Sequence, residues 1–263
     1  MTACPTPPKF DDCTDLRGRS PVDPGIFKQS RTLILMVLGQ SMWGNYGTCT
    51  LYAPAAGHVY EFNIWDQKIY PSDGGPVLSA GGGAISITPY LADMLIGYGH
   101  CARVLLVNLA IGSTSCADWD IMGKCYPRIQ AALCQLNELG LQPNYCCVIQ
   151  GHQDVSLGTT YDQFTKTRIS MYQGIRAIGY HGSIISGLGC WAQQAAGLTS
   201  QMANVKAGQL QAALNMGAPN NVFAGIDDDT MLNNVSFRTD GVHWNDLGRF
   251  YTCWMWAQTF PIW

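Results

Sequence analysis

The sequence predicts an α/β fold in which a parallel sheet of about five strands lies between two layers of helices. Two observations favour this three-layer α/β/α sandwich. Several apolar runs have no polar interruption, which is typical of parallel strands buried on both faces. These runs alternate with longer segments that carry a single apolar stripe, the pattern of helices that connect parallel strands.

The elements follow one another regularly after the first apolar run, Leu33–Leu38, which predicts the first strand over 32–38. The Gly-rich, aromatic segment 44–83 lacks helical patterning, so we expect loops and short strands there. A helix is expected to begin at Thr88-Pro89, with Thr88 as its N-cap, and to continue through Ile96. The remaining strands are expected at 103–108, 145–149, 182–186 and 221–224, and the remaining helices at 127–139 (with Gly140 as its C-cap), 161–178, 199–214 and 245–259.

Residues 1–30 differ from the rest because they hold five of the 13 prolines and show no hydrophobic period. We expect an extended arm or linker that either wraps on the domain or joins it to an upstream domain or a virion structure. Residues 31–263 contain no repeat or composition break, so we expect them to form one domain. The first residues carry neither a basic segment nor an apolar core, which favours a cytoplasmic or virion-associated protein over a secreted one.

Composition narrows the choice of partner. The net charge is −3 and the chain has no basic run, so we expect no positive surface potential that would attract nucleic acid or an anionic membrane. Neither is an expected partner. No apolar run has the length of a transmembrane helix. Charged residues make up only 13% of the chain, and it contains 8 Trp and 12 Tyr. A polar, uncharged and aromatic surface suits a carbohydrate partner.

The chain has 11 cysteines, most of which lie in apolar surroundings that predict reduced, buried thiols. No paired CxxC pattern indicates a zinc site, and we expect no metal. Five cysteines lie in or beside predicted loops and could pair under oxidising conditions: Cys4, Cys13, Cys49, Cys116 and Cys125.

Four predicted turns carry polar groups that suit acyl transfer, a reaction that needs a nucleophile, a base, a carboxylate and oxyanion donors. If each turn follows a strand, parallel strands bring all four to one edge of the sheet. The turns are Ser41, Gly112-Ser113, 150–154 and 240–243. Asp240 lies three residues before His243, so its carboxylate can reach the imidazole. The alternative is that Asp240 caps a turn and His243 is an ordinary surface residue.

Four segments also resemble, in order, the sequence blocks of the SGNH (GDSL-like) hydrolases. The similar branch is that of the sialate O-acetylesterases and acetylxylan-esterase-like carbohydrate esterases, whose first and third blocks read GQSN and QGESD. The resemblance spans about residues 31–260 and implies a flavodoxin-like sandwich, no cofactor, and ester hydrolysis through a serine acyl-enzyme. The segments are Gly39-Gln40-Ser41-Met42, 108–119 with Gly112 inside it, Gln150-Gly151-His152-Gln153-Asp154, and Asp240-Gly241-Val242-His243.

The resemblance implies roles at individual positions. Ser41 would be the nucleophile and, through its N–H, an oxyanion donor, with the Gly112 N–H as a second donor. His243 would act as base and then acid, oriented by Asp240. For the third donor, the superfamily's GxND block points to Gln153, whereas the carbohydrate-esterase branch points to Gln150.

We favour Gln150 for this donor, because the extra methylene at 153 changes the reach of the amide. Met42 and His152 depart from the expected asparagine and glutamate, which affects substrate choice rather than the chemical steps. His152 is also a rival base, but the one carboxylate at a suitable spacing, Asp154, is better placed to bind backbone groups.

Three tryptophans flank these blocks, and indole rings can stack on the C–H faces of sugars. Trp43, Trp119 and Trp244 are therefore candidate substrate-binding residues, with core packing as the alternative. Together these residues and the resemblance predict a serine esterase that removes O-acetyl groups from a polysaccharide or a sialic-acid-type sugar. The alternative is a non-catalytic glycan-binding module, such as a phage tail part, that keeps the esterase fold.

Overall fold

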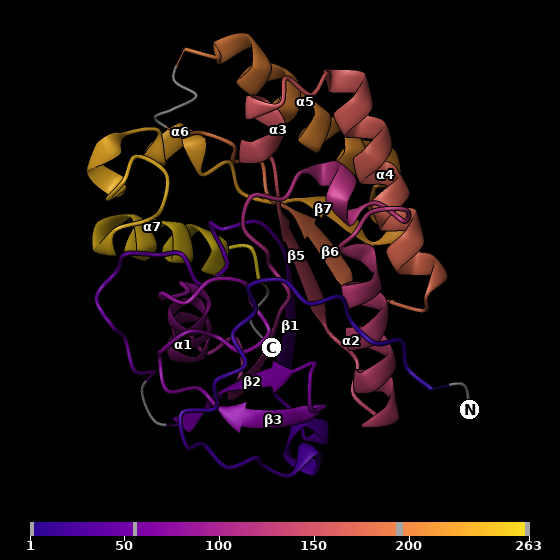
Figure 1. Cartoon of the computed structure of the whole chain (residues 1–263), viewed down its shortest axis with the longest axis vertical. Coiled ribbons are helices and arrows are strands. Elements are labelled where there is room, and N and C mark those ends of the chain that lie inside the picture. The colour runs from indigo at the N-terminus through magenta and orange to yellow at the C-terminus, as the bar shows by residue number, and fades with distance from the viewer. Residues whose placement is uncertain (1–2, 55–56, 193–196, 261–263) are drawn as a thin grey trace.

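A seven-stranded sheet forms the centre of the computed structural model, which describes residues 3–54, 57–192 and 197–260 (Figure 1). The first two residues of the predicted arm and the last three of the predicted domain lie outside this range. The strands are β1 (Thr32–Gly39), β2 (Val59–Asn63), β3 (Lys68–Pro71), β4 (Arg103–Asn108), β5 (Tyr145–Ile149), β6 (Ser183–Ser186) and β7 (Val222–Ala224). The α-helices are α1 (Thr88–Gly97), α2 (Tyr126–Glu138), α3 (His152–Ser156), α4 (Tyr161–Ala177), α5 (Thr199–Met216), α6 (Asp229–Leu232) and α7 (Asp246–Ala257).

The strand order is β3-β2-β4-β1-β5-β6-β7, and every pairing except β2 with β3 is parallel. All five predicted strands are present. The expected number was too low because the segment 44–83 supplies β2 and the antiparallel edge strand β3. The central strand β1 pairs with β4 on one side and β5 on the other, so the carboxyl ends of these three strands adjoin. Open α/β sheets bind ligands at this kind of position.

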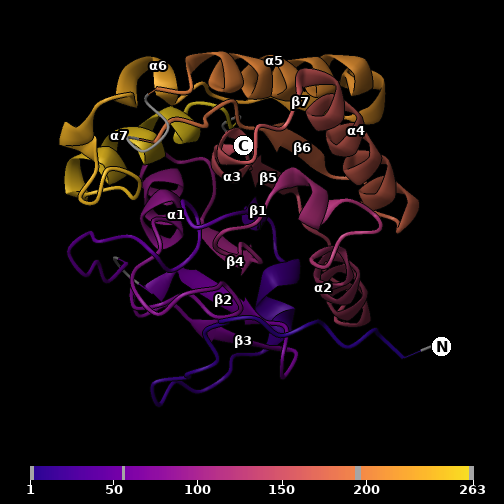
Figure 2. The same cartoon turned by 45° about the horizontal axis from the view of Figure 1, so that its top comes forward.

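Helices cover both faces of the sheet, with α1 and α7 on one face and α2, α4 and α5 on the other (Figures 1 and 2). The continuous apolar run of β1 follows from this arrangement, because successive side chains point to opposite faces. Leu33, Leu35 and Val37 pack toward α1 and α7. The intervening Ile34, Met36 and Leu38 pack toward α2 and α4. The predicted α/β/α sandwich is confirmed.

The helix ends differ slightly from the predictions. The N-cap of α1 is Ile87, and Thr88 is its first residue, with its hydroxyl beside that of Ser86 at 2.9 Å. Gly140 follows the C-cap Leu139 of α2 and has a φ of +69°, the left-handed conformation that terminates a helix. None of the helices in the described ranges has both the length and the apolar character needed to cross a bilayer.

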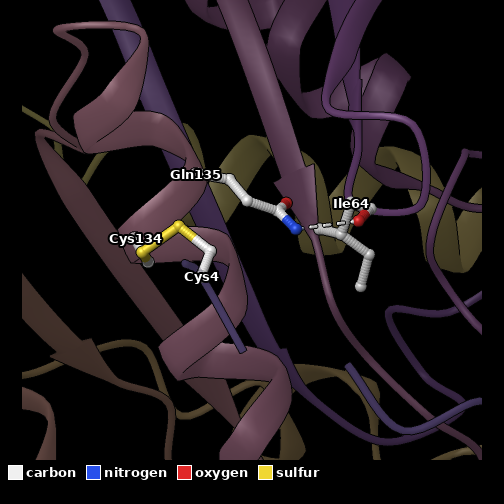
Figure 3. The surroundings of a disulfide bond; sticks show 4 residues. All are labelled: Cys4, Ile64, Cys134 and Gln135. Carbon is white, nitrogen blue, oxygen red and sulfur yellow. Dashed lines mark hydrogen bonds between the residues drawn. A yellow bond between two sulfur atoms is a disulfide. The ribbon is translucent and has the colours of Figure 1, made fainter. Parts of the chain in front are cut away.

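The described part of the arm, residues 3–30, lies against the domain. A disulfide joins Cys4 to Cys134 on α2 (Figure 3). Further along, Asp12 forms a fully buried ion pair with Arg128, with 2.5 Å between carboxylate oxygen and guanidinium nitrogen. The division into arm and domain stays a prediction.

The disulfide corrects the cysteine prediction. Cys4 was among the five loop candidates, but its partner Cys134 lies on a helix face and was not. The other nine cysteines are free, and all except Cys13 are buried, which agrees with their interpretation as small core residues. Among the described residues, the one group with metal-ligand spacing is Cys4, Cys134 and Glu138, and the disulfide already uses both of its sulfurs.

Candidate active site

The turn that carries Ser41 is fixed by a glycine and a glutamine. Gly39 has a φ of +141°, and a Cβ at this position would lie 1.9 Å from the carbonyl oxygen of Ile149, so β1 can end against β5 only with glycine. The side-chain oxygen of Gln40 accepts hydrogen bonds from the Gln150 amide at 3.1 Å and the Gln153 N–H at 3.3 Å. The serine turn and the turn after β5 therefore hold one another in place.

Asp240 and His243 form a pair within one loop. The Asp240 carboxylate accepts a hydrogen bond from Nδ1 of His243 at 2.7 Å, and from the backbone N–H groups of Val242 and His243 at 2.9 and 2.8 Å. Partial burial alone would raise the pKa of Asp240, but the hydrogen bonds from the His243 ring and these N–H groups lower it to about 2. The carboxylate is therefore ionised and able to orient the imidazole.

This loop does not follow a strand, contrary to the prediction. It lies before α7 and is closed by a bridge between Arg238 and Trp244. Arg238 is buried, donates to the Val242 carbonyl at 2.5 Å, and approaches the Met42 sulfur at 3.7 Å. Its guanidinium stacks on the Trp244 ring at 3.5 Å. Arg238 thus ties the Asp240–His243 loop to the Ser41 turn. Sequence reasoning missed it, because a lone arginine gives no signal of burial.

A pocket of about 260 Å³ brings the predicted nucleophile and base together. Its lining residues come from the turns after β1, β4 and β5, the segment after β6, and the Asp240–His243 loop: Gln40, Ser41, Ser113, His152, Gln153, Ser156, Ala192, Val242 and His243. Nε2 of His243 is buried and has no hydrogen-bond partner among the described residues. It makes no hydrogen bond with Ser41 in this arrangement, but its lone pair is free to accept a proton.

The two candidate amides occupy different environments. Gln150 is buried outside the pocket, and its amide nitrogen donates to Gln40, Asp154 and the Thr114 carbonyl. Gln153 lines the pocket. The preference for Gln150 as an oxyanion donor is therefore wrong for this arrangement, because its N–H groups already hold the turn together.

Gly112 is covered by a residue that sequence reasoning did not select. Its N–H donates to the Tyr46 hydroxyl at 3.2 Å, and that hydroxyl in turn hydrogen-bonds to Asp11 of the arm. The Tyr46 ring also stacks on His243, with ring centroids 5.9 Å apart. In this state Gly112 offers no free donor, contrary to the prediction. The next residue, Ser113, lines the pocket in a left-handed conformation with a φ of +55°, which costs a non-glycine residue energy.

The three tryptophans do not line the pocket, and the prediction that they stack on sugars is wrong. Trp43, Trp119 and Trp244 are each at most 2% exposed. Trp43 packs edge-on against Trp256, and Trp119 donates its indole N–H to the Thr114 hydroxyl at 3.0 Å. These side chains belong to the core beneath the turns, which was the alternative.

His152 lies in the pocket wall but lacks the features of a base. Burial, assisted by the positive charge of Arg238, lowers the pKa of His152 to about 3, so the ring is neutral. As expected, Asp154 binds backbone instead, accepting the Cys116 N–H at 3.0 Å. Asp240 therefore orients His243, whereas His152 has no carboxylate partner among the described residues.

Comparisons with known proteins agree with this architecture. Neither a protein-family model nor a curated protein sequence matches the chain. Solved structures do match: a protein from Arabidopsis thaliana has 14% identity and a TM-score of 0.66, covering 88% of this chain and 97% of its own. NanS has 12% identity and a TM-score of 0.58 (87% and 96% covered). An acetyl xylan esterase from Geobacillus stearothermophilus, solved as a variant, has 14% identity and a TM-score of 0.53 (88% and 95% covered). The chain therefore shares its fold with these structures, among them an acetyl xylan esterase.

Proposed function

We propose that this protein is a serine esterase that removes O-acetyl groups from a carbohydrate. One observation carries the proposal: Asp240 orients His243 at 2.7 Å, and His243, whose Nε2 has no hydrogen-bond partner among the described residues, lines the same pocket as Ser41. Binding alone requires no carboxylate–imidazole pair beside a serine. The small pocket suits a short acyl group, and the fold shared with an acetyl xylan esterase supports a sugar ester.

In the proposed reaction, the Ser41 Oγ attacks the ester carbonyl while Nε2 of His243 takes its proton. The resulting oxyanion is stabilised by the Ser41 N–H and the side-chain amide of Gln153. His243 then returns the proton to the departing sugar hydroxyl, leaving an acetyl group on Ser41. A water molecule, deprotonated by His243, then attacks the acetyl carbon. The bond to the Ser41 Oγ breaks, acetate leaves, and His243 returns the proton to the Ser41 Oγ.

The test is hydrolysis of p-nitrophenyl acetate by the wild type and by Ser41→Ala. We expect the variant to lose roughly four orders of magnitude in kcat. A fluorophosphonate probe should label the wild type and not the variant. Ser113→Ala, which changes the other serine turn, is the control for labelling. Retention of activity by Ser41→Ala would refute the assignment of the nucleophile.

Acetate release from a panel of acetylated polysaccharides then tests the substrate class. If the wild type binds these glycans but neither hydrolyses them nor reacts with the probe, the glycan-binding alternative replaces the esterase.

A further inference from the structure

His152 is the least satisfied polar side chain of the pocket wall. It is the first residue of α3 and only 8% exposed, and both ring nitrogens are buried. The backbone of Trp191 is a polar neighbour of the ring, but no hydrogen bond of normal geometry joins the ring to any described residue. A buried donor or acceptor left without a well-formed hydrogen bond destabilises the fold. Because native interiors rarely keep such groups, each one calls for an explanation.

The surroundings of His152 keep its ring neutral. Burial and the nearby guanidinium of Arg238 both disfavour a charge on the ring. A neutral imidazole carries one N–H donor and one acceptor nitrogen. The partner it lacks must therefore both accept and donate a hydrogen bond, as a hydroxyl group does.

The position of the ring shows which ligand can supply that hydroxyl. His152 shares the pocket with Ser41 and His243, and so with the reacting ester. Small side chains line the same pocket, among them Ser156 and Ala192. An acetylated sugar places a free hydroxyl on the carbon next to the ester.

We infer that His152 is a specificity-determining residue that binds the free hydroxyl beside the ester of an acetylated polyol. This inference rests on the proposed esterase function and narrows its substrate class to esters with a neighbouring hydroxyl. It also gives a reason for histidine at a position where the resembling esterases carry glutamate. A carboxylate only accepts hydrogen bonds, whereas a neutral imidazole also donates one.

The kinetic test compares two substrates. One is a mono-acetylated methyl xyloside with free hydroxyls, and the other is p-nitrophenyl acetate, which has none. We expect His152→Phe to lower kcat/KM for the xyloside by about 10- to 100-fold, the effect of leaving a substrate hydroxyl without its hydrogen-bond partner. The loss of kcat/KM with p-nitrophenyl acetate should be about tenfold smaller than the loss with the xyloside, because p-nitrophenyl acetate has no hydroxyl for the ring to bind. His152→Gln, which keeps a donor and an acceptor, should restore part of the loss.

His100→Phe is the matched control, because His100 is also buried but lies outside the pocket. An equal loss on both substrates would make His152 structural or catalytic and overturn the inference. No loss on either substrate, or a wild type that hydrolyses only p-nitrophenyl acetate, would overturn it as well.

A binding measurement separates this inference from the proposed function. The ring nitrogen signals of His152 are identified by their absence from the His152→Phe variant. In Ser41→Ala protein with ¹⁵N-labelled histidines, adding the acetylated xyloside should shift these signals. The same xyloside with its free hydroxyls methylated should not shift them. If the signals do not move, the inference is wrong whether or not the wild type is an esterase. If they move but Ser41 is not required for turnover, only the proposed reaction fails.

Discussion

The carboxylate of Asp240 lies 2.7 Å from Nδ1 of His243 and also accepts the backbone N–H of that residue at 2.8 Å. One carboxylate therefore fixes both the ring and the main chain of the proposed base. Arg238 adds a second restraint, because it donates to the Val242 carbonyl within the same loop. The imidazole is thus held in one orientation before any substrate arrives.

Replacing Asp240 by asparagine should remove the interaction that orients the imidazole of His243. The amide cannot hold the proton on Nδ1 as a carboxylate does, so we expect Asp240→Asn to lower kcat for p-nitrophenyl acetate by roughly 10³- to 10⁴-fold. Asp246→Asn is the control, since Asp246 is a nearby acid whose partners are Thr50 and Arg249. A loss smaller than about tenfold in Asp240→Asn would contradict the proposed role.

Substitution of Gln153 should affect catalysis, whereas substitution of Gln150 should affect the stability of the fold. Gln153 lines the pocket, so Gln153→Ala should lower kcat by about 10²- to 10³-fold, the effect of losing one oxyanion donor. Gln150 holds the Ser41 turn and the Thr114 carbonyl, so Gln150→Ala should lower the free energy of unfolding by about 1–3 kcal/mol. Steady-state kinetics and urea unfolding of both variants measure the two effects. The reverse pattern would restore Gln150 as the donor.

The regular part of the fold was predictable because it depends on local patterns. The continuous apolar run of β1 requires burial on both faces, and the structure places helices on each. The short strands expected in 44–83 are present as β2 and β3, but the total of about five was too low because no clear alternation of apolar and polar residues locates either strand.

The details of the site were less predictable, because they depend on contacts between segments far apart in sequence. The pairing of Asp240 with His243 follows from their spacing of three residues. By contrast, Tyr46 covers Gly112, 66 residues away, and nothing in the local sequence indicates that contact. The tryptophans beside the blocks were misjudged for the same reason, since proximity in sequence to Ser41 does not reveal that Trp43 points into the core.

Burial of His152 should make the stability of the protein depend on pH. The ordinary histidine pKa of 6.5 falls to about 3 in the folded state, so the unfolded chain binds a proton more readily between these values. The contribution of this histidine to the free energy of unfolding is therefore fully present above about pH 6.5 and is lost as the pH drops toward 3. At pH 5 the free energy of unfolding should be lower than at pH 7 by roughly 2 kcal/mol because of this histidine.

Urea unfolding at both pH values, with wild type, His152→Phe and His100→Phe, checks this expectation. His152→Phe should lose less stability on acidification than the wild type does, by about that amount. An identical loss in the wild type and His152→Phe would show that the histidine is not held neutral.

Tyr46 links the arm to the site, and removing its hydroxyl should raise activity. The hydroxyl occupies the Gly112 N–H, so an oxyanion can use that donor only after displacing a hydrogen bond worth about 1 kcal/mol. Tyr46→Phe keeps the ring that stacks on His243 and frees the N–H, so we expect kcat/KM for p-nitrophenyl acetate to rise by roughly fivefold. Tyr52→Phe is the matched control, because the Tyr52 hydroxyl also hydrogen-bonds to an aspartate, Asp93, but does not line the pocket. A fall in kcat/KM confined to Tyr46→Phe would mean instead that the hydroxyl, anchored by Asp11, is needed to hold the ring against the imidazole.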